Sequence, residues 1–257
     1  MHFARRLLTA VSLACLLAVP AMDSRLSAAE FNDAQRGEII ETIRQYLLEN
    51  PEFLREVIQA LDQKEQQQQL AQAADAIKEN AKAIFRDEKD FVAGNPEGDV
   101  TVVEFFDYNC GYCKRSQPDL MALLKQDKNV RFVLKEFPIL GPGSLVAAKA
   151  AIAAKNQDKY WEFHNALMAH NGSLDEAAVF ATAKKVGLDL EKLKADMQGE
   201  AVTAQIEDGY RLARELGIQG TPAFVIGDKF LPGAVGLDAL TKTVAEVRGS
   251  GSCKALC

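Results

Sequence analysis

The fold and the chemistry meet in residues 100–126, VTVVEFFDYNCGYCKRSQPDLMALLKQ, where an apolar run leads into two cysteines three positions apart. The run Val100–Phe106 is typical of a buried strand. Beyond Cys113, leucines at helical spacing predict a helix that ends near Gln126. Cys110 and Cys113 are therefore expected where a strand gives way to the N-terminus of a helix.

This position favours a reactive thiol at Cys110. Unpaired backbone N–H groups and the positive end of the helix dipole stabilise a thiolate there, which lowers the pKa of Cys110 and makes it the attacking sulfur. Cys113 is then the resolving thiol. Gly111 and Tyr112, between the two cysteines, set the local hydrogen bonds to the thiolate and so influence the potential of the dithiol.

Two cysteines at this spacing also occur as half of a zinc site, which normally needs four ligands. The other candidate ligands are distant in the sequence: Cys253 and Cys257 end the chain, and the histidines are His2, His164 and His170. Redox chemistry is therefore the favoured interpretation, and a metal site or an inert structural disulfide is the alternative. No resident metal is expected.

The first residues resemble a secretory signal. Arg5 and Arg6 precede an apolar segment, residues 7–21, that is too short to span a membrane. Small residues before and at Ala29 predict cleavage after that residue and a periplasmic mature chain. A lipoprotein that keeps an acylated Cys15 is the weaker alternative.

Cleavage at this point makes the chain more acidic. It removes three arginines and one aspartate, so the formal net charge moves from −6 to −8. An acidic chain of this kind is not expected to bind nucleic acid. Four cysteines remain in an oxidising compartment, where a dithiol can cycle between its two states.

Residues 30–90 are rich in Gln, Glu, Lys, Arg and Ala and are predicted to be helical. Apolar residues at alternating three- and four-residue steps form a stripe: Ile40, Ile43, Leu47, Leu54, Val57 and Leu61. After the polar run 64–69, a weaker stripe from Leu70 to Ile84 points to the next domain. We expect an oligomerisation arm, with dimer and trimer both open. The alternative is an arm that folds back onto the following domain.

A second strand is predicted at Val130–Phe137. A helix connects it to the first strand, so the two are expected to be parallel. A turn-rich stretch, residues 94–99, precedes the first strand, and Phe91 and Val92 before this turn are expected to form a short edge strand.

Residues 144–216 are almost continuously helical in pattern and are predicted to form an inserted helical subdomain. The expected helices cover residues 146–155, 160–168, 174–186 and 190–215. Ser173 and Glu176 have the spacing of a capping box at the start of the third helix. Trp161 and Phe163 are expected in the core or beside a groove, and neither His164 nor His170 is expected to bind metal.

The sheet resumes after this subdomain. Pro222–Ile226 and Lys229–Leu231 flank Gly227-Asp228 and predict a hairpin, followed by a helix over residues 237–247. Thr221-Pro222 stands immediately before the strand, where a cis-proline is a common device of tight turns.

These features together resemble the thioredoxin-like fold of the DsbA family: a dithiol at a helix N-terminus after a central strand, a helical insertion, and Thr-Pro before a hairpin. The long helical arm and the Gly-Tyr pair inside the dithiol resemble the oligomeric disulfide isomerases of the periplasm, the suppressor-of-copper-sensitivity C proteins and related alphaproteobacterial forms. The fold class expected is α/β, thioredoxin-like with an inserted helical subdomain, preceded by an N-terminal helical oligomerisation arm.

The resemblance implies a role for each matched residue. Cys110 is the nucleophile, Cys113 the buried resolving thiol, and Pro222 a cis-proline that faces them. Thr221 offers its backbone to a substrate peptide. Glu104 matches the family's buried acid, which accepts the proton of Cys113.

Three further expectations concern residues beside these. An unpaired buried carboxylate is costly, so Lys135 is expected to be the charge partner of Glu104. The alternative for Glu104 is a solvent-facing strand position. Gly111 and Tyr112 are expected to contact substrate together with Thr221.

The sequence thus divides into six predicted segments: a signal peptide (1–29), the arm (30–90), the first part of the thioredoxin-like domain (91–143), the helical subdomain (144–216), the second part of that domain (217–248) and a Cys-containing tail (249–257). In the tail, Cys253 and Cys257 form a local disulfide, a redox relay or a metal site.

The predicted function is disulfide isomerisation of exported proteins, with a membrane thiol reductase as the implied partner. Three alternatives remain open: a dithiol oxidase, a protein that binds Cu(I) through Cys110 and Cys113, and a noncatalytic chaperone.

Overall fold

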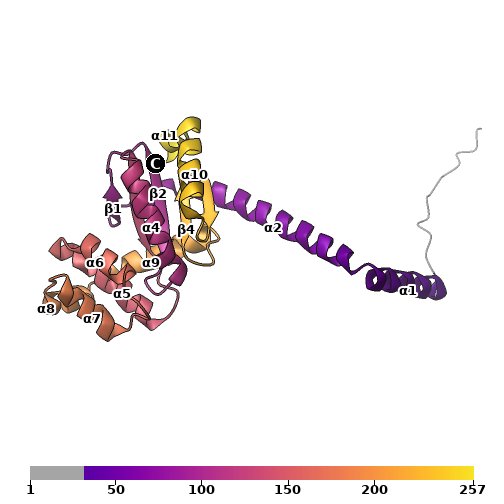
Figure 1. The fold of residues 1–257 in the computed structure, drawn as a ribbon, viewed down its shortest axis with the longest axis horizontal. Helices are drawn as coiled ribbons and strands as arrows, with labels where there is room; N and C mark the ends of the chain where they lie inside the picture. The colour runs from indigo at the N-terminus through magenta and orange to yellow at the C-terminus, as the bar shows by residue number, and fades with distance from the viewer. Residues whose placement is uncertain (1–31) are drawn as a thin grey trace, which may run out of the picture. The chain divides into compact units, whose positions relative to one another are not determined.

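The computed structural model describes residues 32–257; the predicted signal peptide and Cys15 lie outside them. Its sheet has the strand order β1-β3-β2-β4-β5 (Figure 1). The strands are β1 (Phe91–Gly94), β2 (Val100–Phe106), β3 (Val130–Glu136), β4 (Ala223–Ile226) and β5 (Lys229–Pro232). Strands β2 and β3 are parallel, and the other neighbouring pairs are antiparallel. The predicted edge strand, the parallel pair and the hairpin are all present.

Strand β2 is central, and all seven of its residues are buried. Val102 and Phe106 face helices α4 (Gly111–Gln126) and α10 (Gly236–Ser250), while Val103 and Phe105 face the opposite side of the sheet. Because successive strand residues point to opposite faces, a strand with apolar residues on both faces needs cover on both. This explains why the run before the dithiol shows no polar alternation.

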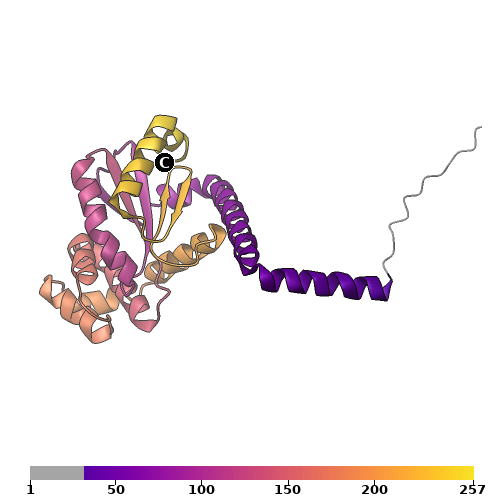
Figure 2. The same ribbon diagram turned by 45° about the vertical axis from the view of Figure 1, so that its right-hand side comes forward.

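The inserted helical subdomain lies beyond one end of the strands (Figure 2). Its helices are α5 (Pro142–Ala154), the short 3-10 helix η1 (Lys155–Gln157), α6 (Tyr160–Met168), α7 (Glu176–Lys185), α8 (Leu190–Asp196) and α9 (Glu200–Glu215). Helix α9 reaches back along the sheet, because Leu212 and Ala213 pack in the same cluster as Val103.

Two helix predictions in this subdomain are wrong. The single helix expected over residues 190–215 is broken, since the chain makes a tight turn before the extended residue Gly199 and restarts as α9. The capping box is also absent. Asp175 caps α7 instead, accepting a 2.8 Å hydrogen bond from the N–H of Ala178. An aspartate immediately before the helix is as good a cap as a serine two residues earlier.

The arm is helical, with α1 (Asp33–Glu49), α2 (Pro51–Glu79) and α3 (Ala81–Phe85). The described residues form two compact units that divide after Gln59, and α1 belongs to the first. Between α1 and α2, both the N–H and the side-chain amide of Asn50 donate to the carbonyl of Tyr46. The predicted apolar stripe is exposed in this chain: Ile40 by 66%, Ile43 by 53%, Leu54 by 47% and Leu61 by 52%.

The end of the arm packs on the sheet. Ala73, Ile77, Ile84 and Phe85 are buried, and the last three join the cluster on the face of Phe105. The two alternatives for the arm therefore apply to different parts. The second, weaker stripe folds back onto the domain, and most residues of the first stripe are exposed.

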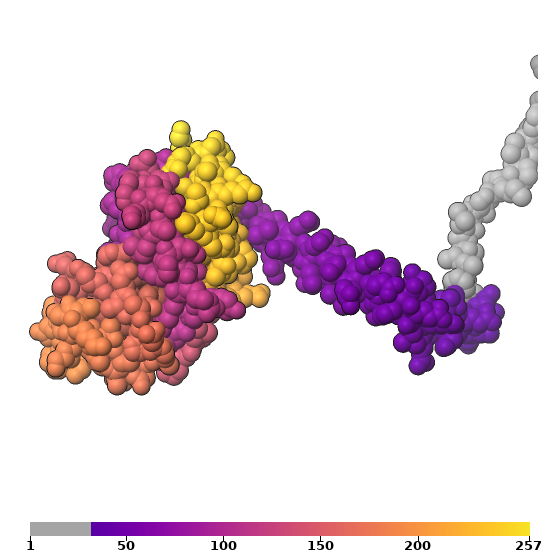
Figure 3. Space-filling model, viewed as in Figure 1, coloured from indigo at the N-terminus to yellow at the C-terminus, as the bar shows by residue number. Residues whose placement is uncertain are grey.

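The C-terminal helix packs beside the end of the arm, because Leu256 lies against the cluster that contains Ile84 and Phe85. Helix α11 (Ser252–Leu256) follows α10, and the two appear together in Figure 3. Cys253 and Cys257 form a disulfide, and the Cys253 sulfur accepts a 3.2 Å hydrogen bond from the N–H of Thr101 at the start of β2. The tail is thus fastened to the central strand. Within residues 32–257, no helix is long and apolar enough to cross a membrane.

Candidate active site

Cys110 is the N-cap residue of α4 and directly follows the three-residue turn, residues 107–109, that leaves β2. Its sulfur accepts a 3.4 Å hydrogen bond from the N–H of Cys113. Both cysteines are free thiols, and both are buried, Cys110 to 5% exposure and Cys113 completely. Gly111 and Tyr112 between them are exposed. The Cys110 sulfur therefore lies just below the protein surface, and the Cys113 sulfur lies deeper in the core.

The loop before β4 completes the site. The peptide bond between Thr221 and Pro222 is cis, as predicted. As a thiol, Cys110 donates a 3.1 Å hydrogen bond to the carbonyl of Thr221, which is half-buried. Residues 111 positions apart in the sequence are thus in direct contact at the attacking sulfur.

The pKa values of the two thiols are shifted in opposite directions. The hydrogen bond from the Cys113 thiol, helped by the side chain of Thr221 and by the N–H groups of Tyr112 and Cys113, outweighs burial and lowers the pKa of Cys110 to about 5. Burial, the hydrogen bond to Cys110 and the charge of Glu104 raise the pKa of Cys113 far above its ordinary value. At neutral pH the dithiol is therefore a thiolate at Cys110 with a thiol at Cys113.

Glu104 lies beneath the dithiol on β2 and is completely buried, so the solvent-facing alternative is excluded. Neither of its carboxylate oxygens has a hydrogen-bond partner among the described residues. Burial, and then the charge of Cys110, raise the pKa of Glu104 well above the ordinary value. A carboxyl group in this position therefore binds a proton more readily than an exposed one, and more readily still while Cys110 carries its charge.

The predicted partnership between Glu104 and Lys135 is wrong. In the parallel register, Glu104 is opposite Leu134, and Lys135 is opposite Phe105. Paired residues share a face of the sheet, so Lys135 points to the face away from the dithiol.

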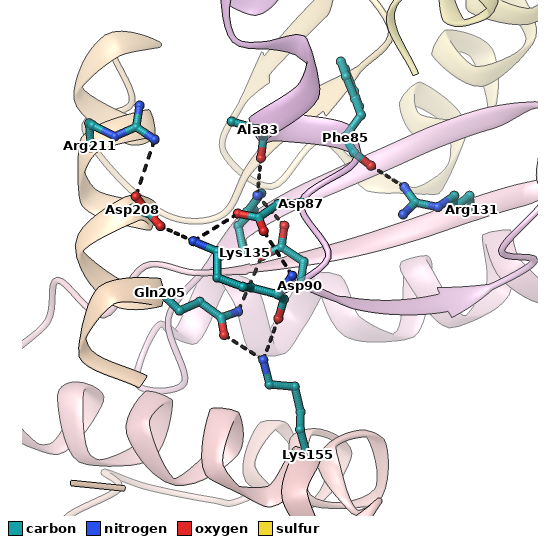
Figure 4. A network of polar contacts seen from close by, with 11 residues as sticks. Ala83, Phe85, Asp87, Asp90, Arg131, Lys135, Lys155, Gln205, Asp208 and Arg211 are labelled. Atoms are coloured by element: carbon teal, nitrogen blue, oxygen red, sulfur yellow. Dashed lines mark hydrogen bonds and ion pairs between the residues drawn. The ribbon is translucent and has the colours of Figure 1, made fainter. Parts of the chain in front are cut away.

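Lys135 instead contacts the C-terminal end of the arm, at Ala83 and Asp90 (Figure 4). It forms an ion pair with Asp90 and donates to the carbonyl of Ala83. Both charged side chains of this pair are only 4% exposed. The ion pair therefore belongs to the docking of the arm, and Lys135 has no place in the thiol chemistry.

Asp107, which no sequence motif singled out, shapes the loop below Cys110. Its carboxylate accepts hydrogen bonds from the N–H groups of Asn109, Ile139 and Leu140 and from the hydroxyl of Ser144, at 2.7–2.9 Å. The signal was available, because an aspartate after a strand and two residues before an asparagine often forms such a turn.

A second missed group is a buried network that ties the helical subdomain to the sheet. The hydroxyls of Tyr108 and Tyr160 donate to Glu136, and the Tyr108 oxygen lies 3.1 Å from Nδ1 of His164. Burial raises the pKa of Glu136 to about 8 and lowers that of His164 to about 3. Sequence spacing does not reveal this network, since its members come from three separate elements.

Tyr112 lies at the rim of the site. It is 60% exposed, and the guanidinium of Arg115 sits 4.2 Å from its ring centre. Within residues 32–257, no group of three or more His, Cys, Asp or Glu side chains is arranged to hold a metal ion.

This chain is similar in sequence and structure to proteins of known families. Residues 101–245 match the DSBA-like thioredoxin domain, and residues 35–68 match the N-terminal domain of the copper resistance protein ScsC. A thioredoxin-like oxidoreductase from Silicibacter pomeroyi is 49% identical over 65% of this chain and 97% of its own, with a TM-score of 0.65. A linker-deletion mutant of Proteus mirabilis ScsC is 30% identical over 87% of this chain and 100% of its own, also with a TM-score of 0.65.

Curated relatives include a Na(+)/H(+) antiporter, NhaA 1, from Salinispora arenicola, 35% identical over 62% of this chain. The match spans only 25% of that protein, so the transport named there is not carried over. The fold and the dithiol define a thioredoxin-like thiol-disulfide oxidoreductase. The chain belongs to the DSBA-like thioredoxin domain family.

The reactivity of Cys110 should follow its lowered pKa. Because the thiolate is lost only as the pH falls through about 5, the rate of alkylation by iodoacetamide is expected to be flat above pH 6 and half-maximal near pH 5. Thiolate absorbance at 240 nm should fall over the same range, and Cys110→Ser should show neither transition. A midpoint at pH 8 to 9 would contradict the geometry described for this sulfur.

Proposed function

We propose that this protein is a periplasmic disulfide isomerase that attacks non-native disulfides of exported proteins through Cys110. The observation that carries the proposal is the pair of unequal sulfurs. A stabilised thiolate at Cys110 lies beside the cis-proline loop, and the Cys113 thiol lies buried below it. Such a pair attacks readily and resolves only when its second proton is removed.

The reaction begins when the Cys110 thiolate attacks one sulfur of a substrate disulfide. A bond forms between that sulfur and Cys110, and the other substrate sulfur leaves as a thiolate. Attack by another substrate thiolate on the mixed disulfide then releases Cys110 and leaves the substrate rearranged, with no net oxidation. Thr221 is positioned to pair its backbone with the substrate, and the missing side chain at Gly111 leaves room for approach.

Resolution by Cys113 is the competing branch. Its thiolate attacks the Cys110 sulfur, the substrate leaves reduced, and the protein holds a disulfide that a membrane thiol reductase must reduce. Glu104 is the proposed proton acceptor. Once Cys110 is in a mixed disulfide its charge is gone, so one cause of the raised pKa of Glu104 disappears and the carboxylate can take the proton of Cys113.

The arm supports the isomerase direction. Residues 35–68 match the ScsC N-terminal domain, and the apolar stripe of residues 40–61 is exposed in the single chain. We propose that residues 30–90 assemble a homo-oligomer, a dimer or trimer, through that stripe. Several dithiols on one assembly can hold a misfolded substrate while one of them exchanges its disulfides.

Dithiol oxidation is the second candidate, and one observation favours it. A thiolate with a pKa of about 5 stabilises the reduced form, which makes the disulfide form a better oxidant. The ScsC domain match and the two thiols of Cys110 and Cys113 also keep Cu(I) binding as a separate prediction.

Refolding of scrambled ribonuclease separates the first two candidates. The reduced full-length protein should restore ribonuclease activity at substoichiometric amounts, Cys110→Ser should restore none, and removal of residues 30–59 should give a monomer by light scattering with reduced isomerase activity. The disulfide form should oxidise reduced ribonuclease more slowly than the reduced form reshuffles the scrambled one. Fast oxidation without reshuffling would make the protein an oxidase.

Glu104→Gln tests the proton acceptor. An amide cannot take the Cys113 proton, so resolution of a preformed mixed disulfide by Cys113 is expected to slow by on the order of a hundredfold, while alkylation of Cys110 changes little. Quenched-flow analysis of the mixed disulfide across pH measures this step. If its pH dependence is the same in both proteins, Glu104 has no part in proton transfer.

A further inference from the structure

A groove of about 390 Å³ lies beside the cis-proline loop. Thr221 and Pro222 form part of it, and Tyr112, the exposed residue inside the dithiol, lines its edge. A second wall comes from α2, through Gln66, Gln69 and Leu70. The arm helix therefore contributes directly to the surroundings of the attacking sulfur.

The α2 wall is held in place by the residues that follow it. Ala73 and Ile77 are buried, and they lie three and seven residues beyond Leu70, on the same face of the helix. Ile77 packs in the core cluster with Ile218 of the cis-proline loop, and Phe230 of β5 packs against that cluster. Leu70 is 38% exposed, so its side chain borders the groove as a partly covered apolar surface.

The chemistry of the lining indicates what the groove accepts. None of the described residues that line it is charged, and the lining includes Leu70, Ile218, Phe230 and Pro222. The side-chain amides of Gln66 and Gln69 can donate and accept hydrogen bonds. This combination suits an extended polypeptide, since its apolar side chains meet apolar walls and its backbone meets the amides.

The groove is continuous with the attacking sulfur. Thr221 lines it and, through its carbonyl, contacts the sulfur of Cys110 at 3.1 Å. A polypeptide whose disulfide reaches Cys110 therefore brings the residues next to its cysteine into the groove. Glutathione disulfide carries charged groups and no apolar side chains beside its cysteines, so it gains little from the apolar part of the α2 wall.

We propose that α2 forms one wall of the client groove and that Leu70, Gln66 and Gln69 select clients with an extended apolar segment next to the attacked disulfide. This inference rests on the proposed attack by Cys110. It gives the arm a role in client recognition that is separate from oligomerisation, because these residues lie beyond the exposed stripe of residues 40–61.

The test compares two disulfides. Reduced full-length protein reacts with a peptide disulfide flanked by Leu and Val, and with glutathione disulfide, and the second-order rate constant for each is measured. Leu70→Ser should lower the ratio of the peptide constant to the glutathione constant by about threefold to tenfold, since apolar contact is lost only for the peptide.

Introducing a charge at Gln69 tests whether α2 contacts the peptide, without removing an apolar side chain. Gln69→Glu should favour a peptide with Lys beside the disulfide over one with Asp by about threefold or more. Gln68→Glu is the matched control, because Gln68 is exposed on the same helix and does not line the groove, and it should leave that preference unchanged.

The outcomes separate this inference from the proposed function. If the unaltered reduced protein reacts with neither glutathione disulfide nor the peptides, the proposed function fails. If it reacts with all of them, but Leu70→Ser and Gln69→Glu behave like Gln68→Glu, the α2 wall has no part in client selection and the inference is wrong.

Discussion

The contact on which the structure depends is that of the Cys110 sulfur with the N-terminus of α4 on one side and the Thr221 carbonyl on the other. This contact requires that the α4 N-terminus and the loop of Thr221 be fixed relative to one another. Burial of every residue of β2 fixes the start of α4, and the pairing of β4 with β2 brings the cis-Pro222 loop to the same end of the sheet. The packing of the core thus fixes the position of the Cys110 sulfur between α4 and the cis-proline loop.

The chemistry follows from the different surroundings of two identical groups. Cys110 has hydrogen-bond donors and a path to solvent, and Cys113 has burial and the nearby carboxyl of Glu104. Glu104 stays unpaired in the core, which costs stability and keeps a proton-accepting group where Cys113 needs one. An isomerase benefits from this asymmetry, because a slow second step leaves time for the substrate to rearrange.

Local sequence signals predicted the elements that make the site: the strand before Cys110, the helix after it, the cis-Pro222 and the hairpin. Each depends on neighbours in sequence. Partners across the fold could not be predicted in this way, as the pairing of Lys135 with Asp90 shows, because it depends on which face of the sheet each strand residue occupies. The same reason hid the contacts of Tyr108 with Glu136 and His164, and the position of Leu70 beside the cis-proline loop.

The redox equilibrium of the dithiol with glutathione measures how strongly the α4 N-terminus and the side chain of Thr221 in the cis-proline loop stabilise the Cys110 thiolate. A pKa of about 5 lies between those of thioredoxin, about 7, and DsbA, about 3.5, and so predicts a reduction potential of roughly −220 to −150 mV. A value below about −250 mV, in the range of thioredoxin, would show that these groups do not stabilise the thiolate.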